Sequence, residues 1–186
     1  MNSNADRRAY AEQVIRAPLS GSGSPSAWPR RVIVIVLAII DMVLAGYLAL
    51  YQWRWIDTVW DPFFGVGSEL VLDSVVSESF RRLFLVPDAA VGAAGYLAEA
   101  VLGLIGKTDR WWRHPWLVVA FGAVAAAMAL VGLLLVVLQG AVVGAWCFIC
   151  LVTAALSLIM AWVVYPEARA SLRILFGARG TGDRAS

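Results

Sequence analysis

Apolar residues fill four long runs of this sequence, at positions 32–51, 86–105, 116–138 and 143–164. A helix of about 20 apolar residues is long enough to cross the hydrocarbon layer of a membrane, which is about 30 Å thick. The pattern therefore predicts an all-α integral membrane protein. The expected architecture is a four-helix bundle with one long outer loop between the first two helices.

The polar segments divide the chain into three parts. Residues 1–30 are polar and rich in Gly, Ser and Pro near their end, and they lack the apolar stretch and cleavage site of a signal peptide. They are predicted to form a flexible cytoplasmic tail. Residues 31–166 contain the four apolar runs and form the predicted membrane domain, and residues 167–186 form a predicted cytoplasmic C-terminal tail.

Composition agrees with a lipid environment. Hydrophobic residues make up 61% of the 186 residues and charged residues only 15%, whereas soluble domains are about 25% charged. The mean hydropathy is +0.75. Basic residues lie near the ends of the apolar runs and form no patch with interleaved aromatic residues, so nothing indicates nucleic-acid binding.

The distribution of Lys and Arg predicts the orientation, because cytoplasmic flanks collect these residues. Both tails and the link between the second and third runs are basic, so all three are expected in the cytoplasm. The loop between the first two runs is acidic and is expected on the outer side of the cell membrane, opposite the cytoplasm. Its acidic residues are Asp57, Asp61, Glu69, Asp73, Glu78 and Asp88.

The only two cysteines, Cys147 and Cys150, stand at the outer start of the fourth run. Two thiols three residues apart share one face of a helical turn and can form a local disulfide, and the free N–H groups of a helix start favour a thiolate. A structural zinc site needs four ligands, and the only histidine, His114, lies at the opposite end. The pattern predicts a redox dithiol and no metal; the alternative is two cysteines packed as small apolar residues.

Four stretches carry a resemblance to a known family. They are GAWCFICL at 144–151, VLDS at 71–74, VP at 86–87 and GAAGY at 92–96. In this order, with four apolar runs, the chain resembles the vitamin K epoxide reductase family. The resemblance runs from the first apolar run to the fourth and leaves out both tails.

The resemblance implies a membrane thiol oxidoreductase that passes electrons from thiols to a quinone, either menaquinone or ubiquinone. By this resemblance Cys147 exchanges with an incoming thiol, as the cysteine nearer the water, and Cys150 faces the quinone. The thiol donor would be a small external thiol or a thioredoxin-like protein. Ser74 corresponds to the family's loop serine beside the quinone, and its alternative role is a solvated or helix-capping serine.

Three aromatic residues are candidates for an apolar quinone pocket: Tyr96, Trp146 and Phe148. The alternative is that they only anchor the protein at the membrane interface.

The outer loop departs from the family pattern, because family enzymes carry two further cysteines there. Ser68 stands at one of these positions, and the other falls near Asp61 and Pro62. Serine cannot replace sulfur in thiol–disulfide exchange. Two functions therefore remain open: an enzyme whose donor reaches Cys147 directly, and a non-catalytic subunit that packs within a larger membrane complex.

Two acidic residues lie inside the apolar runs, Asp41 in the first and Glu99 in the second. A carboxylate at the centre of a membrane costs at least about 2.5–3.5 kcal/mol, so each is expected to face the bundle interior, a cavity or a partner. Both are candidates for proton handling, since quinone reduction takes up protons. The alternative is a carboxyl that only hydrogen-bonds a neighbouring helix.

Overall fold

The computed structural model describes residues 26–107 and 110–180, and every regular element in these residues is helical. The all-α prediction is therefore confirmed. The predicted N-terminal tail lies almost entirely outside the described residues. In chain order the helices are α2 (Trp28–Gln52), α3 (Gly67–Leu72), α4 (Val75–Phe84), α5 (Asp88–Leu104), α6 (Arg110–Arg113), α7 (Pro115–Leu138), the π-helical turn η1 (Gln139–Val143) and α8 (Phe148–Gly180).

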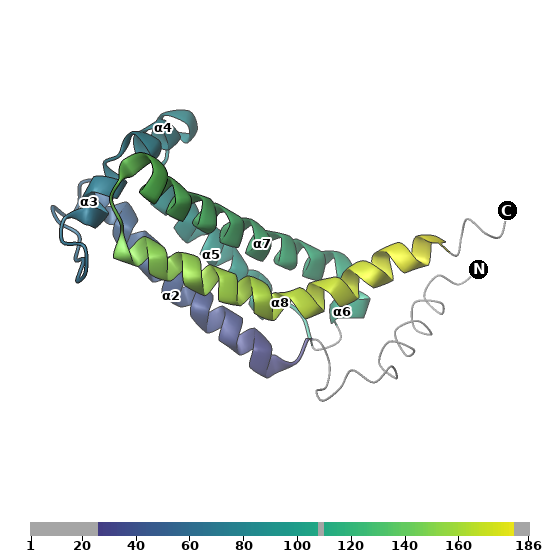
Figure 1. Ribbon diagram of the computed structural model, residues 1–186. Coiled ribbons are helices and arrows are strands. Elements are labelled where there is room, and N and C mark those ends of the chain that lie inside the picture. The colour runs from purple at the N-terminus through teal and green to yellow at the C-terminus, as the bar shows by residue number, and fades with distance from the viewer. Residues whose placement is uncertain (1–25, 108–109, 181–186) are drawn as a thin grey trace.

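Four long helices, α2, α5, α7 and α8, lie side by side as a bundle (Figure 1). Helix α2 packs against α5 and α8, and α7 packs against the same two helices, so the four close into a ring. The short helices α3 and α4 lie at one end of the bundle, and α6 lies at the other (Figure 1).

Prolines and left-handed residues mark several helix boundaries. Pro29 and Pro115 stand in the first turns of α2 and α7, where a missing N–H costs nothing. Helix α4 ends at Leu85, whose φ is 59°, and Pro87 directly precedes α5. Helix α7 continues through η1 and ends at Gly144, whose φ of 68° suits glycine.

Three helical stretches are long and apolar enough to cross a membrane: Trp28–Gln52, Pro115–Val143 and Phe148–Phe176. Helix α5 has 17 residues, which is about 25 Å. It reaches spanning length only together with α4, which meets it at a bend of 67°. The described residues therefore contain three such spans, or four when this bent pair is one of them.

Small residues bring the helices close together. A methyl group added at Gly103 would overlap Ile35 of α2, and one added at Gly122 would overlap the Cβ of Ala168 in α8. This is the packing role expected of small residues between membrane helices.

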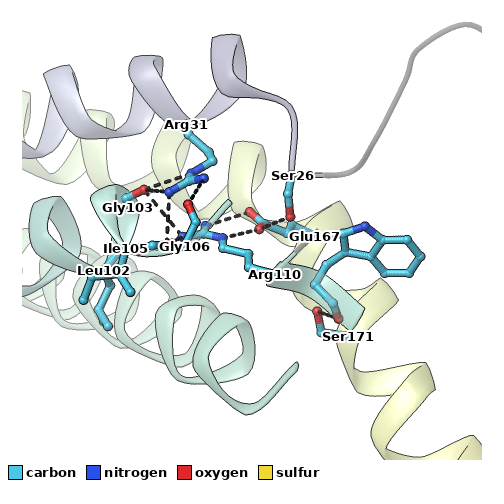
Figure 2. Close-up of polar contacts among 10 residues, drawn as sticks. Ser26, Arg31, Leu102, Gly103, Ile105, Gly106, Arg110, Glu167 and Ser171 are labelled. Carbon is cyan, nitrogen blue, oxygen red and sulfur yellow. Dashed lines mark hydrogen bonds and ion pairs between the residues drawn. The ribbon is translucent and has the colours of Figure 1, made fainter. Parts of the chain in front are cut away.

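At the end of the bundle near α6, three buried charged residues form what we call the arginine cluster: Arg31, Arg110 and Glu167 (Figure 2). Arg110 pairs with Glu167 at 2.7 Å, and Arg31 donates to the carbonyl oxygens of Gly103 and Ile105. These carbonyls terminate α5 and have no helical partner of their own. The cluster thus joins the ends of α2 and α5 to α6 and to the middle of α8.

Helix α8 continues well past the predicted domain boundary at residue 166. Pro166 lies within the helix, and the helix extends to Gly180. Beyond the proline, Ser171 donates a hydrogen bond of 3.0 Å to the Trp111 carbonyl. Much of the predicted C-terminal tail is therefore an extension of the fourth long helix.

Candidate redox site

The two cysteines lie at the bundle end that carries α3. Cys147 is the last residue before α8, and Cys150 belongs to the first turn of that helix. Both thiols are free. The Cys150 N–H donates to the Cys147 Sγ at 3.2 Å. The sulfur of Cys147 therefore stands over the open N–H groups at the start of α8, where a negative charge is stabilised.

Several neighbouring groups shift the pKa of the Cys147 thiol. A hydrogen bond from the Cys150 thiol lowers the pKa of Cys147 most strongly, and the Ser68 hydroxyl and the Cys150 N–H lower it further. Burial and the negative charge of Asp61 oppose this shift, but the net pKa lies below the ordinary value for cysteine. Cys147 is thus favoured as the thiolate, which is the reactive form of a thiol.

Asp61 joins the outer loop to the start of α8 through hydrogen bonds. Its Oδ2 accepts a hydrogen bond of 2.7 Å from the Ser68 hydroxyl and one of 3.3 Å from the Phe148 N–H. Its Oδ1 accepts the N–H groups of Phe63 and Phe64 at 3.1 and 2.8 Å. Burial raises the pKa of Asp61, but these hydrogen bonds outweigh it and hold the pKa below its usual value.

Cys147 is fully buried, with 0% of its surface exposed, while Cys150 is partly exposed. Cys147 is therefore less accessible than Cys150 in this conformation, although it precedes α8 and Cys150 lies within the helix. The start of α3 covers it, because Gly67 packs so tightly on the Trp146 carbonyl that any side chain at 67 would overlap it. An external thiol can reach Cys147 only when this loop moves.

Gln139 is a site residue that no sequence pattern indicated. Its side-chain oxygen accepts the Cys147 N–H at 3.1 Å, and it lies in the π-helical turn that ends α7. The dithiol otherwise packs among apolar residues of α2 and α3, including Leu48, Tyr51 and Leu72.

The other predicted site residues are not brought to one place. Ser74 caps α4, accepting the Ser77 N–H at 3.4 Å, which matches its alternative role. Phe148 lies beside the dithiol with its ring 4.9 Å from that of Phe63. Trp146 is adjacent and partly exposed. Tyr96, in contrast, packs in the apolar core and bonds Ser157 at 2.8 Å.

Asp41 and Glu99 both face the interior of the bundle. Each is 0% exposed, so the expectation that neither points at lipid is confirmed. The four carboxyl oxygens have no hydrogen-bond partner among the residues that the structure describes. The alternative role, a carboxyl hydrogen-bonded to a neighbouring helix, is therefore not what this conformation contains.

A family model for the vitamin K epoxide reductase family matches residues 32–165, which is well over half of the chain. The chain belongs to this family. The match covers the outer loop, the dithiol, all of α5 and α7, and more than half of α2 and of α8. A comparison with curated proteins found no match. Membership identifies the chain as a multi-pass membrane protein of a family of thiol–disulfide oxidoreductases that are linked to quinones in general.

Proposed function

We propose that this protein oxidises external thiols and passes their electrons to a quinone through Cys147 and Cys150. The observation that carries the proposal is the contact between the two cysteines, in which the Cys150 N–H donates to the Cys147 sulfur at 3.2 Å. It combines a thiolate-favouring first cysteine with a second thiol one helical turn away, which is the arrangement that dithiol chemistry requires.

The reaction has two halves. A donor dithiol attacks the Cys147–Cys150 disulfide through Cys147, and two exchange steps leave an oxidised donor and a reduced enzyme dithiol. The dithiol then gives two electrons and two protons to the quinone, which becomes a quinol, and the enzyme disulfide forms again. The donor is a small thiol or a thioredoxin-like protein.

The donor must act on Cys147 directly, because the chain has no other cysteines. Asp61 and Ser68, near the positions expected for the loop cysteines, instead form a hydrogen-bonded pair over the dithiol. In this proposal the Asp61–Ser68 hydrogen bond keeps the loop closed over Cys147. Thiol exchange takes place after this bond breaks and the loop opens.

For the quinone, the part of the site nearest Cys150 is the candidate. Phe148 and Trp146 flank the dithiol and supply aromatic surface, and Ser74 stands at the start of α4 in the same end of the bundle. Tyr96 lies deeper and would act on the reaction only from within the core. Turnover with soluble analogues of menaquinone and ubiquinone distinguishes the two candidate quinones.

We further propose that the protein resides in the cell membrane with both termini in the cytoplasm and the dithiol on the outer side. The support is the Lys and Arg content of the two tails and of the 105–113 link, set against the acidic loop that precedes α5.

The decisive experiment is a single turnover of the full-length protein in liposomes. The reduced protein, freed of reductant, is mixed with a soluble menaquinone or ubiquinone analogue, and quinol is measured by absorbance. We expect one quinol per dithiol, with a matching loss of alkylatable thiols. Cys147→Ser and Cys150→Ser should form none, whereas Ser79→Ala, at an exposed position of α4, should match the parent. Absence of quinol with both analogues would refute the proposal.

A further inference from the structure

Two buried carboxyl groups within the bundle have no hydrogen-bond partner among the described residues. Asp41 belongs to α2 and Glu99 to α5, and both are completely buried with all four oxygens unpaired among the described residues. Buried polar groups in proteins almost always have hydrogen-bond partners. The buried hydroxyls of Tyr96 and Ser157 in the same core obey this rule. The two carboxyls therefore call for a separate explanation.

The packing of α2 on α5 brings the two carboxyls together. Gly103 lies against Ile35, and Gly92 lies against Ala45, so the helices are antiparallel. This register places Asp41 opposite the turn that contains Tyr96. Glu99 is three residues further along α5 than Tyr96, so the two carboxyls lie within about one helical turn of each other along the bundle.

Two negative charges cannot both persist at this place. An isolated ionised carboxylate in an apolar interior is unstable, and a like charge nearby raises the cost. Arg31 is the nearest basic residue toward the arginine cluster, and its donors are bonded to the carbonyls that end α5. Helix α7 has no ionisable residue. The remaining ionisable residues of the other three helices before Glu167 are Arg30, Tyr47, Tyr51, Asp88, Tyr96, Cys150 and Tyr165.

A row of hydroxyl groups leads from the dithiol toward this pair. Cys150, Thr153 and Ser157 lie on one face of α8, since they are spaced by three and four residues. Thr153 donates to the Cys150 carbonyl at 3.1 Å, and Ser157 donates to the Thr153 carbonyl at 2.8 Å. The Ser157 hydroxyl is bonded in turn to Tyr96, one turn before Glu99. Polar side chains of the interior thus lie in a row between the two sites, and the row ends at Tyr96, which has no hydrogen bond to either carboxyl.

We propose that Asp41 and Glu99 share one proton and serve as the proton relay of the dithiol–quinone reaction. This inference rests on the proposed function. When the dithiol is oxidised it releases two electrons and two protons, and the quinone takes up both to become a quinol. One of the two protons passes through the carboxyl pair, which gives its proton to the reduced quinone and regains one from the dithiol, so the pair is unchanged after each turnover. The other proton passes from the dithiol to the quinone without the pair.

The test is modification by dicyclohexylcarbodiimide, an apolar reagent that attacks protonated carboxyls in apolar surroundings. Full-length protein in liposomes is treated over a range of pH, and the adducts are located by peptide mass spectrometry. We expect an adduct at Asp41 or Glu99 that disappears as pH rises. In Glu99→Gln the adduct should form at Asp41 and disappear at a pH about one unit lower or more, since the like charge is gone. In Asp41→Asn the adduct should form at Glu99 and should likewise disappear at a lower pH than in the parent.

Two controls complete this arm. Glu78→Gln, on the exposed surface of α4, should leave the labelling profile unchanged. The double variant Asp41→Asn with Glu99→Gln should label at neither position while keeping the helical circular dichroism of the parent. Protection from labelling by sodium ions at constant pH would overturn the proposal, because the pair would then hold a metal ion and not a proton.

A second arm measures turnover. Asp41→Asn and Glu99→Gln should each slow quinol formation at high pH by about tenfold, while exchange of the disulfide with dithiothreitol stays at the parent rate. A parent protein that labels as expected but forms no quinol would refute the proposed function and leave the shared proton in place. Turnover in the parent without an adduct at either position, or with pH profiles unchanged in both single variants, would overturn the proton relay.

Discussion

Arg110 and Glu167 form an ion pair of 2.7 Å in which the two side chains are only 0% and 6% exposed. The Arg110 guanidinium also donates to the carbonyls of Leu102 and Ile105 at 2.7 and 2.9 Å. One side chain therefore joins the end of α5 to α6 and α8, as Figure 2 shows. The charges are fully paired, so removal of either partner leaves an unpaired charge in a buried place.

The first prediction concerns this pair. Replacing Glu167 with Gln should lower the free energy of unfolding by about 3–5 kcal/mol, because Arg110 would keep its charge without a partner. Denaturant unfolding in detergent micelles, followed by circular dichroism, would measure the loss. Arg82→Gln breaks the exposed pair with Glu78 on α4 and should have little effect. Equal effects of the two variants would contradict a stabilising role for the buried pair.

The second prediction concerns the cover over Cys147. Gly67→Ala places a methyl group against the Trp146 carbonyl, and such overpacking costs about 1–3 kcal/mol. The loop should open more often, and the alkylation rate of Cys147 by a maleimide should rise roughly tenfold. Gly46→Ala, which adds a methyl group in open space, is the matched control. An alkylation rate equal to that of the parent would mean that Gly67 does not govern access.

The third prediction concerns pH. The folded-state pKa of Asp61 lies below its value of about 3.9 in an unfolded chain, so Asp61 stabilises the closed loop above that pH. This stabilisation is lost as pH falls through the lower, folded-state pKa. Below about pH 4, Cys147 should therefore react faster with dithiodipyridine, which attacks thiols in acid. Asp61→Asn should remove this acid dependence, and Asp57→Asn, at an exposed loop position, should preserve it.

The fourth prediction separates the roles of the cysteines. Cys150→Ala treated with glutathione disulfide should accumulate a glutathione adduct on Cys147, because no second thiol is present to displace it. The parent should instead form the internal disulfide without an adduct. Intact-protein mass spectrometry distinguishes these products. A stable adduct on the parent protein would show that Cys150 does not resolve mixed disulfides.

The fifth prediction concerns orientation. In a background of Cys147→Ser and Cys150→Ser, an impermeant maleimide added to intact cells should label Asp57→Cys in the acidic loop. Lys107→Cys should react only after the cells are permeabilised. Labelling of Lys107→Cys in intact cells would reverse the proposed topology.

The sequence predicted which segments are helical better than it predicted the residues at which the helices begin and end. Apolar runs found α2 and α7 to within a few residues, because lipid requires a continuous apolar stretch. The fourth run was expected to begin at residue 143, but the π-helical turn takes up Gln139–Val143 and α8 starts at Phe148. Hydropathy cannot separate these, since both segments are apolar. The C-terminal extension of α8 carries charges, and hydropathy therefore ended the span too early.

The candidate site was predictable only where it is local. Cys147 and Cys150 stand three residues apart, so their relationship follows from helix geometry alone. The contact from Asp61 to the Phe148 N–H joins residues 87 positions apart, and no short pattern reveals it. The same limit hid the burial of Cys147. The carboxyls of Asp41 and Glu99, in contrast, were placed inward correctly, because lipid offers them no partner.

The cover that α3 forms over Cys147 also bears on chemical damage. A thiolate is the form of cysteine that peroxides oxidise, and oxidation beyond the sulfenic acid is irreversible in most proteins. Here the lowered pKa of Cys147 coincides with complete burial, so oxidants in the surrounding water have little access to the resting thiolate. Disulfide formation with Cys150 needs a two-electron acceptor, which in the proposed reaction is the quinone, and it needs no oxidant from the water because the two thiols already lie in contact. The closed loop therefore leaves the reversible disulfide as the preferred oxidation product and disfavours sulfinic and sulfonic acids.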